Sequence, residues 1–406
     1  MRIGGVRVFD GEQVLHDRDV VVSDGVIAEV IDAAGLPADV DGHGRTLLPG
    51  FFDAHVHLDP RPDTALRHLV ESGVTTALDM FSGGEPLTRI VAIRQSDPPD
   101  LADVRTAGTG ATAPGSMLEK LTGHTLPTVT DAHAAHAWVQ ARLAEGADYI
   151  KIIYDEREGG PLSVATLTAL IEAAHAHGVL AVAHTMTEQH ARTALAAGID
   201  GLAHLFIGDD ATADFGRFAA DHDVFIIPTL IVLRGFCGYR PHDDLRTDQR
   251  LAYRMRRPPM PVRPADPSRH HLYKAATKAL RQLTAAGIVL LAGTDTSLPT
   301  ATLGVFGYGA TLHAELELLV QGGLSPTQTL IAATSAPARA FRLPDRGFIR
   351  PGMRADLLLV DGDPTNDIRD TRNIVAVWKR GARIHPHTSN AEPSAPASHP
   401  DADPQP

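Results

Sequence analysis

Residues 47–58 read LLPGFFDAHVHL and decide the fold, because an apolar run leads there into two closely spaced histidines. Side chains alternate between the two faces of a β-strand, so His55 and His57 point one way while Val56 points the other. The chain holds 21 histidines, and such a pair on its own arises readily by chance. Its place after a Pro-Gly turn and an apolar strand makes it a candidate metal site.

Four other apolar runs end in residues that extend this pattern. They are Lys151 after DYI, His184 after LAVA, His204 after GLA and Asp295 after LLAGT. The strands of an α/β barrel are parallel, and active sites in that fold lie where their carboxyl ends meet. Imidazole nitrogens and carboxylate oxygens are suitable ligands for zinc and similar divalent cations. The pattern therefore predicts a metal centre at that end of a barrel.

The middle of the chain alternates between strand-like and helix-like segments. Strands are predicted at 51–57, 74–80, 103–108, 149–153, 180–184, 201–206, 224–233 and 288–295. Amphipathic segments separate most of them, for example 166–177 before Gly178 and 191–197 before Gly198. Eight strands with intervening helices predict an α/β protein whose residues 50–346 form a (β/α)8 TIM-like barrel.

Both ends of the chain are rich in short strands instead. Strands are predicted at 2–9, 19–22, 26–31, 355–360 and 374–379, with turn signals such as Asp10-Gly11 between them. Neither block can bury a core alone. We expect residues 1–49 and 347–385 to form one small β-sandwich domain. Residues 386–406, rich in Pro, Ala and Ser, are predicted to be a disordered tail.

Composition limits the classes of partner. The formal net charge of −12 argues against nucleic acid or an anionic membrane as the main partner. The expected partner is a small-molecule substrate. Self-association into a homo-oligomer is left open. A single cysteine, Cys237, excludes an internal disulfide framework. The chain start lacks the pattern of a signal peptide, and the sequence has no long uncharged apolar run, so a cytoplasmic location is expected.

Two connections are longer than is usual in a compact domain. The segments 235–271 and 296–311 follow the last two predicted barrel strands, and the first is rich in Pro and Arg. Long loops in such positions are either functional lids or disordered. We favour lids over the metal centre.

Three stretches resemble one known family. LLPGFFDAHVHL is similar to the first barrel strand of the amidohydrolase superfamily, and GFIRPGMRADLLLVDGDP at 347–364 resembles the return of that superfamily's chain into its small β-domain. HAELELLVQGGLSPTQTLIAATSAPARAF at 313–341 is similar to the helices after strand eight in the imidazolonepropionase-like branch, which includes metal-dependent prolidases. The resemblance extends from residue 1 to about residue 385.

This resemblance implies a ligand set for two metal ions, most plausibly zinc. His55, His57 and Asp295 would hold one ion, His184 and His204 the other, and Lys151 would bridge them. An ammonium group beside two cations is costly and has no lone pair to donate. A carbamate formed from Lys151 and CO₂ is an anion with two oxygens, which suits a bridge.

The resemblance also implies catalytic and substrate-contacting residues. Asp295 would take a proton from the attacking water, and we place Tyr154 and His204 in the catalytic set beside it. Tyr154 could hydrogen-bond the carbonyl oxygen of a substrate, or it could simply pack. His124 resembles part of a Gly-Gly-His element of the branch that reaches substrate, although Thr122 replaces the first glycine. His313 is a further candidate for the pocket.

Histidines on predicted helices are interpreted differently. We expect exposed, non-functional positions for His133, His136, His175, His177 and His190.

The combined pattern predicts a metal-dependent hydrolase of C–N bonds, in an amide, an Xaa-Pro-like dipeptide, an N-acyl amino acid or a lactam. One alternative is a one-metal deaminase or imidazolonepropionase-type enzyme, which Glu188, four residues after His184, would partly fit. Another is an ester, carbamate or organophosphate hydrolase on the same site. A non-enzymatic relative is disfavoured because all six ligand positions are kept.

Overall fold

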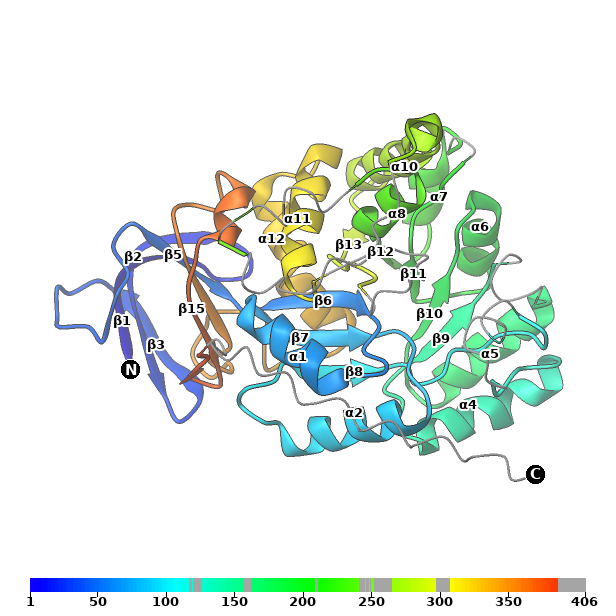
Figure 1. The fold of residues 1–406 in the computed structure, drawn as a ribbon, viewed down its shortest axis with the longest axis horizontal. Helices are drawn as coiled ribbons and strands as arrows, with labels where there is room; N and C mark the ends of the chain where they lie inside the picture. The colour runs from blue at the N-terminus through cyan, green and yellow to red at the C-terminus, as the bar shows by residue number, and fades with distance from the viewer. Residues whose placement is uncertain are drawn as a thin grey trace, which may run out of the picture.

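The computed structural model describes residues 1–116, 119, 126–155, 162–208, 211–240, 245, 248, 250–251, 265–296 and 307–385. It places a sheet built from both chain ends at one end of the long axis and an α/β body beside it (Figure 1). Residue 124, most of the two long connections and the tail 386–406 lie outside the described residues, so the expectations on them stay predictions.

The terminal sheet joins residues that are more than 300 positions apart in the sequence. Its eight strands are β1 (Arg2–Phe9), β2 (Val14–Ser23), β3 (Val26–Asp32), β4 (Val40–Asp41), β5 (Arg45–Pro49), β14 (Leu357–Asp361), β15 (Ile374–Lys379) and β16 (Ala382–Arg383). β14 pairs antiparallel with β5, where Leu358 lies opposite Leu48. The order β16-β15-β14-β5-β1-β2-β3, with β4 beside β1, is one hydrogen-bonded sheet. The sandwich form and the domain limits stay predictions.

The α/β body contains all eight predicted strands as parallel strands. One sheet holds β6 (Phe51–Val56), β7 (Val74–Asp79) and β8 (Asp103–Thr106), and a second holds β9 (Ile150–Ile153), β10 (Ala181–His184), β11 (Gly201–Ala203), β12 (Phe225–Ile227) and β13 (Val289–Leu290). Isolated parallel bridges join Val56 to Thr296 and Ala111 to Ile152. The two sheets are therefore linked at both of their edges.

One predicted strand runs on into a segment that is helical in the structure. The expected strand 224–233 ends at Ile227, and its apolar continuation forms the helix α8 (Leu230–Phe236). Thr229, between them, has a left-handed φ of 48° that ends the strand. The run of Ile, Val and Leu favours a strand locally, and contacts from elsewhere in the chain override that preference.

Helices cover the outer faces of the two sheets (Figure 1). They are α1 (Pro62–Glu71), α2 (Gly84–Ser96), α4 (Ala135–Ala144), α5 (Val164–Ala176), α6 (Glu188–Ala196), α7 (Phe215–Ala220), α10 (Tyr273–Ala285), α11 (Ala310–Gly322), α12 (Pro326–Ala332) and α13 (Ser335–Ala340), with the 3-10 turns η1 (Ala132–Ala134), η2 (Pro267–Leu272) and η3 (Ile368–Arg372). The predicted helices 166–177 and 191–197 both exist. Each begins earlier than expected, because Ser163 and Thr187 cap them through their hydroxyls.

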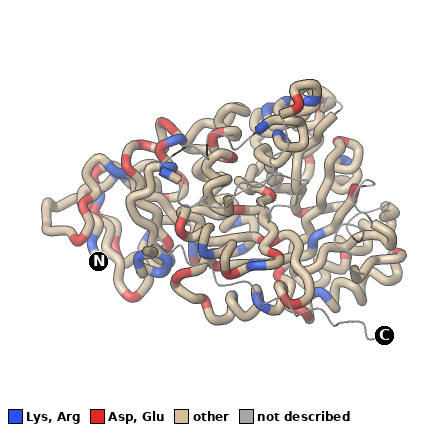
Figure 2. The backbone as a smooth tube through the Cα atoms, in the orientation of Figure 1, with Lys and Arg blue, Asp and Glu red and all other residues tan. Residues whose placement is uncertain are grey.

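A buried ion network joins the terminal sheet to the α/β body. Asp103, at the start of β8, contacts Arg346 and lies 3.3 Å from Arg354, and all three side chains are almost fully buried. Figure 2 shows basic residues gathered at this junction.

Among the described residues, no helix combines the length and apolar character that crossing a membrane requires.

Candidate metal centre

His55, His57 and Asp295 meet at the carboxyl end of β6. The Oδ1 atom of Asp295 lies 3.2 Å from Nε2 of His55 and 2.9 Å from Nε2 of His57. The two Nε2 atoms are 3.4 Å apart, so the predicted alternation along β6 holds. The backbone explains the meeting: Asp295 donates its N–H to the carbonyl oxygen of His55 at 2.7 Å.

The other two histidines continue this cluster as a row of rings. The ring centroids of His55 and His204 are 4.9 Å apart, and those of His204 and His184 are 4.5 Å apart. His184 ends β10 and His204 follows β11, so adjacent parallel strands bring them together. His204 has a left-handed φ of 73°, and Asp295 has one of 56°. Strained backbone of this kind is concentrated at functional sites.

Lys151 lies within β9, next to β10, and is 2% exposed. Its charge is close enough to act on the pKa values of His55, His57 and His204. The structure thus brings all six predicted ligand residues into one region of the body.

The donor set fits a divalent cation. Zinc–ligand bonds of about 2.0–2.2 Å in a tetrahedron place neighbouring ligand atoms about 3.3–3.5 Å apart. The 3.4 Å between the two Nε2 atoms lies within that range, and the 3.2 and 2.9 Å from them to Oδ1 of Asp295 are shorter. Three acceptor-type atoms this close to one another, in a largely buried site, suit a shared cation. His55, His57 and Asp295 therefore form a candidate metal-binding cluster.

Electrostatics hold His55, His204 and Asp295 in the forms that bind metals, whereas for His57 burial is outweighed by the contact with Asp295, which raises the pKa. Burial, together with the charge of Lys151, lowers the pKa of His55 to about 3. Burial and the neighbouring His184 lower the pKa of His204 well below its usual value. Burial alone would raise the pKa of Asp295, but His55 and His57 outweigh it and hold that pKa well below its usual value. Neutral imidazoles and an ionised carboxylate are the ligand forms.

A supporting carboxylate lies on the same strand and was missed by the sequence analysis. Asp53 is fully buried and accepts hydrogen bonds from the N–H of His55 at 3.3 Å and from the N–H and hydroxyl of Thr294 at 3.0 and 2.7 Å. It ties β6 to the segment that carries Asp295. Its place two residues before His55, on the same strand face, was a usable signal.

Tyr154 follows β9 and belongs to a small polar group with two further residues. Its ring centroid lies 5.4 Å from that of His190, and Nδ1 of His190 lies 3.8 Å from the carboxylate of Asp155. The expectation that His190 is exposed was wrong, since only 18% of its side chain is exposed. Helical periodicity could not reveal this, because α6 packs its N-terminal turn toward the end of β9. His133, His136, His175 and His177 are exposed as predicted.

His313 is not a pocket residue. It is fully buried on α11, where Nε2 lies 3.1 Å from the carbonyl oxygen of Ser72 and Nδ1 lies 3.0 Å from the hydroxyl of Thr371. Its ring also packs edge-on against Phe51. The substrate contact expected of it is therefore wrong, because its polar atoms are engaged by these structural contacts.

Glu188 is also engaged away from the histidines. Its carboxylate accepts hydrogen bonds from Arg192 at 2.7 Å and from the N–H of Thr212 at 2.6 Å. The position that would have suited a one-metal deaminase is thus used for an ion pair on α6 and a contact with the following loop.

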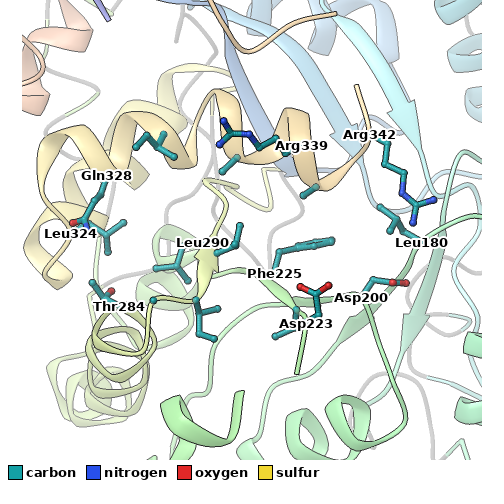
Figure 3. A pocket seen from close by; sticks show the side chains of 17 residues that line it. Leu180, Asp200, Asp223, Phe225, Thr284, Leu290, Leu324, Gln328, Arg339 and Arg342 are labelled. Atoms are coloured by element: carbon teal, nitrogen blue, oxygen red, sulfur yellow. The ribbon is translucent and has the colours of Figure 1, made fainter. Parts of the chain in front are cut away.

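A pocket of about 560 Å³ lies at the opposite strand ends (Figure 3). Leu180, just before β10, Phe225, which begins β12, and Leu290 in β13 line it, with Arg339 from α13 and Arg342 from the turn after it. It shares no residue with the histidine cluster. The ligand residues lie at the carboxyl ends, where an α/β barrel places its chemistry.

Comparison with known proteins agrees with this geometry. A model of the amidohydrolase family matches residues 46–384. A dihydroorotase from Mycobacterium tuberculosis is 28% identical over 413 residues and covers 89% of each chain. The crystal structure of a Xaa-Pro dipeptidase with bound methionine has 21% identity and a TM-score of 0.76, over 95% of this chain and 99% of that one. An A. niger ochratoxinase has 19% identity and a TM-score of 0.72, over 94% and 95%. These structures share the fold.

Proposed function

Because the chain belongs to the amidohydrolase family, whose model spans residues 46–384, we propose that its metal centre hydrolyses the amide-type C–N bond of a small molecule. Membership makes the chain a hydrolase of C–N bonds. The proposed substrates are Xaa-Pro-like dipeptides, N-acyl amino acids and lactams. The observation that carries the proposal is the row of His57, His55, His204 and His184 rings, with Lys151 on the adjoining strand.

The proposed ligand set uses six residues for two divalent ions, zinc being favoured. His55, His57 and Asp295 would hold one ion and His184 and His204 the other, while a carbamate on Lys151 would offer an oxygen to each. Cations bound there supply Lewis acidity toward a carbonyl oxygen and toward water. The close approach of the His55 and His57 rings to one carboxylate supports this assignment.

In the proposed reaction Asp295 moves the proton. Its carboxylate is ionised and lies between His55 and His57, so it can accept a proton from the attacking water. It then donates that proton to the leaving nitrogen, which departs as a neutral amine. Tyr154, at the end of β9, would donate its phenol hydrogen to the carbonyl oxygen as negative charge develops there.

The dihydroorotase similarity favours a second candidate, a cyclic substrate. A protein of that name is 28% identical over nearly the whole of this chain, which places dihydroorotate beside the lactams as a substrate to test. The deaminase alternative is weaker, because Glu188 is committed to Arg192 and Thr212.

We also propose that the eight parallel strands β6–β13 close into a barrel and that residues 1–49 and 347–385 form one β-sandwich domain. The bridges at both sheet edges support the first statement, and the shared core of Ile3, Leu47 and Leu357 supports the second. A crystal structure of the metal-loaded protein tests both.

The function is tested by a substrate screen on metal-loaded protein. Xaa-Pro dipeptides, N-acyl amino acids, lactams, dihydroorotate and aryl esters are compared by kcat/KM, with the Asp295→Asn variant as the low-activity control. We expect the highest value among the C–N substrates. A preference for aryl esters, or an Asp295→Asn variant as active as the wild type, would contradict the proposal.

A further inference from the structure

Helix α11 carries a buried carboxylate that makes no contact with the histidines. Glu315 is fully buried, and its two oxygens accept hydrogen bonds from the backbone N–H groups of Leu230 at 2.8 Å and Ile231 at 2.7 Å. These N–H groups belong to the first turn of α8, where an α-helix leaves its donors without intrahelical partners. Glu315 therefore caps α8 from 85 residues further along the chain.

Thr229 is the N-cap residue of α8, but its side chain does not cap the helix. A threonine at this position ordinarily turns its hydroxyl back onto the first-turn N–H groups. The hydroxyl of Thr229 makes no such bond and instead lies 2.7 Å from Nδ1 of His204. Thr229 adopts a left-handed φ of 48°, which a β-branched residue rarely adopts. The strained turn thus directs the hydroxyl toward the histidine, and Glu315 supplies the missing cap.

His204 needs such an orienting partner. A hydrogen bond at Nδ1 sets the ring's rotation, and when Nδ1 is the protonated nitrogen, the lone pair of Nε2 is left to face a ligand. The rings of His184 and His55 lie on either side of His204, at 4.5 and 4.9 Å. A rotated His204 ring would leave this row.

We propose that Glu315 is a positioning residue of the metal centre: by holding the first turn of α8, it keeps Thr229 in the conformation that orients His204. The proposal rests on the proposed function only in that His204 is a ligand. An apolar side chain at this position would leave the N–H groups of Leu230 and Ile231 without an acceptor, so the turn that holds Thr229 depends on Glu315.

The test compares the zinc affinity of two variants on the same helix. Glu315→Gln keeps the size of the side chain but turns an amide N–H₂ toward one of the two N–H donors. We expect the weaker of two zinc ions to be released about tenfold more readily, in the range found for outer partners of metal ligands. Affinity is measured on metal-stripped protein by competition with a chromophoric chelator, and zinc content by elemental analysis.

The matched control is Glu317→Gln. Glu317 lies two residues further along α11 and forms an ion pair with Arg372 at 2.5 Å, so its loss loosens the helix without touching the 229–231 turn. We expect unchanged zinc affinity in this control, with a fall in Tm comparable to that of Glu315→Gln.

Threonine 229 provides the second arm. Thr229→Val removes the hydroxyl at nearly constant shape and should weaken zinc binding as Glu315→Gln does, while Thr229→Ser should retain it. The double variant Glu315→Gln with Thr229→Val should bind zinc no more weakly than Thr229→Val alone, because both changes act through His204. If Glu315→Gln fails to fold, the Val and Ser variants still decide whether the hydroxyl acts.

The two-metal proposal and the role of Glu315 are contradicted by different results. A wild-type protein that binds only one zinc ion overturns the two-metal proposal. A wild type with two ions, beside a folded Glu315→Gln of equal zinc affinity or a double variant with additive losses, overturns the role of Glu315.

Discussion

At the scale of single residues, Lys151 is the most informative side chain of the site. A lysine that is 2% exposed, on a strand beside His184, would place an ammonium group next to any bound cation. Carbamylation replaces that positive charge with an anion. Under the proposed function, the charge of this one side chain would decide whether the histidine row can hold two ions or one.

Removing Lys151 tests this point. We expect Lys151→Ala to fold and to bind at least one zinc ion fewer. Its kcat/KM should fall by about 100-fold or more, which is at or beyond the upper end of the losses found when a hydrogen-bond partner of a metal ligand is removed. Wild-type protein stripped of metal and CO₂ should regain activity faster with zinc and bicarbonate than with zinc alone. Mass spectrometry without acidification checks the modification. An unmodified lysine in a fully metallated, active enzyme would disprove it.

Asp295 supports a second prediction at this scale. Asp295→Asn keeps an oxygen near His55 and His57 but can no longer accept and return a proton. We expect kcat to fall by about 10²–10⁴-fold, the usual contribution of general acid–base catalysis, with KM changed far less. Steady-state kinetics on the best substrate of the screen measures both. A raised KM with kcat unchanged would point to a role in substrate binding instead.

At the scale of elements, the site depends on how the segment after β13 is tied to β6. Asp53 accepts two hydrogen bonds from Thr294, whose hydroxyl also lies 2.7 Å from that of Thr296. These contacts hold the turn that gives Asp295 its left-handed backbone. Burial raises the pKa of Asp53 to about 7, so this carboxyl depends strongly on its partners.

Thr294→Val tests that tie. The variant keeps the shape of the side chain but leaves one oxygen of the buried Asp53 without its hydroxyl donor. We expect a loss of about 1–3 kcal/mol in the free energy of unfolding, which is the range for an unsatisfied buried polar group. Urea denaturation of the metal-free protein measures it. Thr294→Ser retains the hydroxyl and should lose much less; equal losses in the two variants would point to packing.

At the scale of the whole molecule, the terminal sheet and the α/β body are joined by buried charge. Burial alone would raise the pKa of Asp103, but Arg346, Arg105 and Arg354 outweigh it and lower that pKa to about 2. The network connects β8 to the chain segment between α13 and β14. The two parts should therefore unfold together.

This network predicts a stability change in acid. A carboxyl with a lowered folded pKa contributes its full stability above its unfolded pKa of about 3.9 and loses it as the pH falls toward the folded value. The free energy of unfolding should thus decrease between about pH 4 and pH 2. Asp103→Asn should cost on the order of 3 kcal/mol at pH 7, because it leaves buried arginines less compensated. Urea denaturation across this pH range, in wild type and variant, checks both; an unchanged acid dependence in the variant would contradict them.

The local pattern of the sequence was sufficient to predict the parallel strands and the meeting of His55, His57 and Asp295. Strand alternation placed His55 and His57 on one face, and the rule that barrel chemistry lies at carboxyl strand ends selected Lys151, His184, His204 and Asp295 as candidates. Such placements can be predicted because a strand's periodicity and its end are properties of neighbouring residues; the ligand roles stay predictions.

Other features exist only once distant segments meet. The helix after β12 lies where an apolar run favours a strand, and its first turn is capped by Glu315 from 85 residues away. His190 packs beside Tyr154 instead of lying exposed. His313 is held on the buried side of α11, where its ring nitrogens contact Ser72 and Thr371. These polar groups pair in the folded chain because a buried hydrogen-bond donor without an acceptor costs free energy. That requirement acts in three dimensions, so only the tertiary structure decided it.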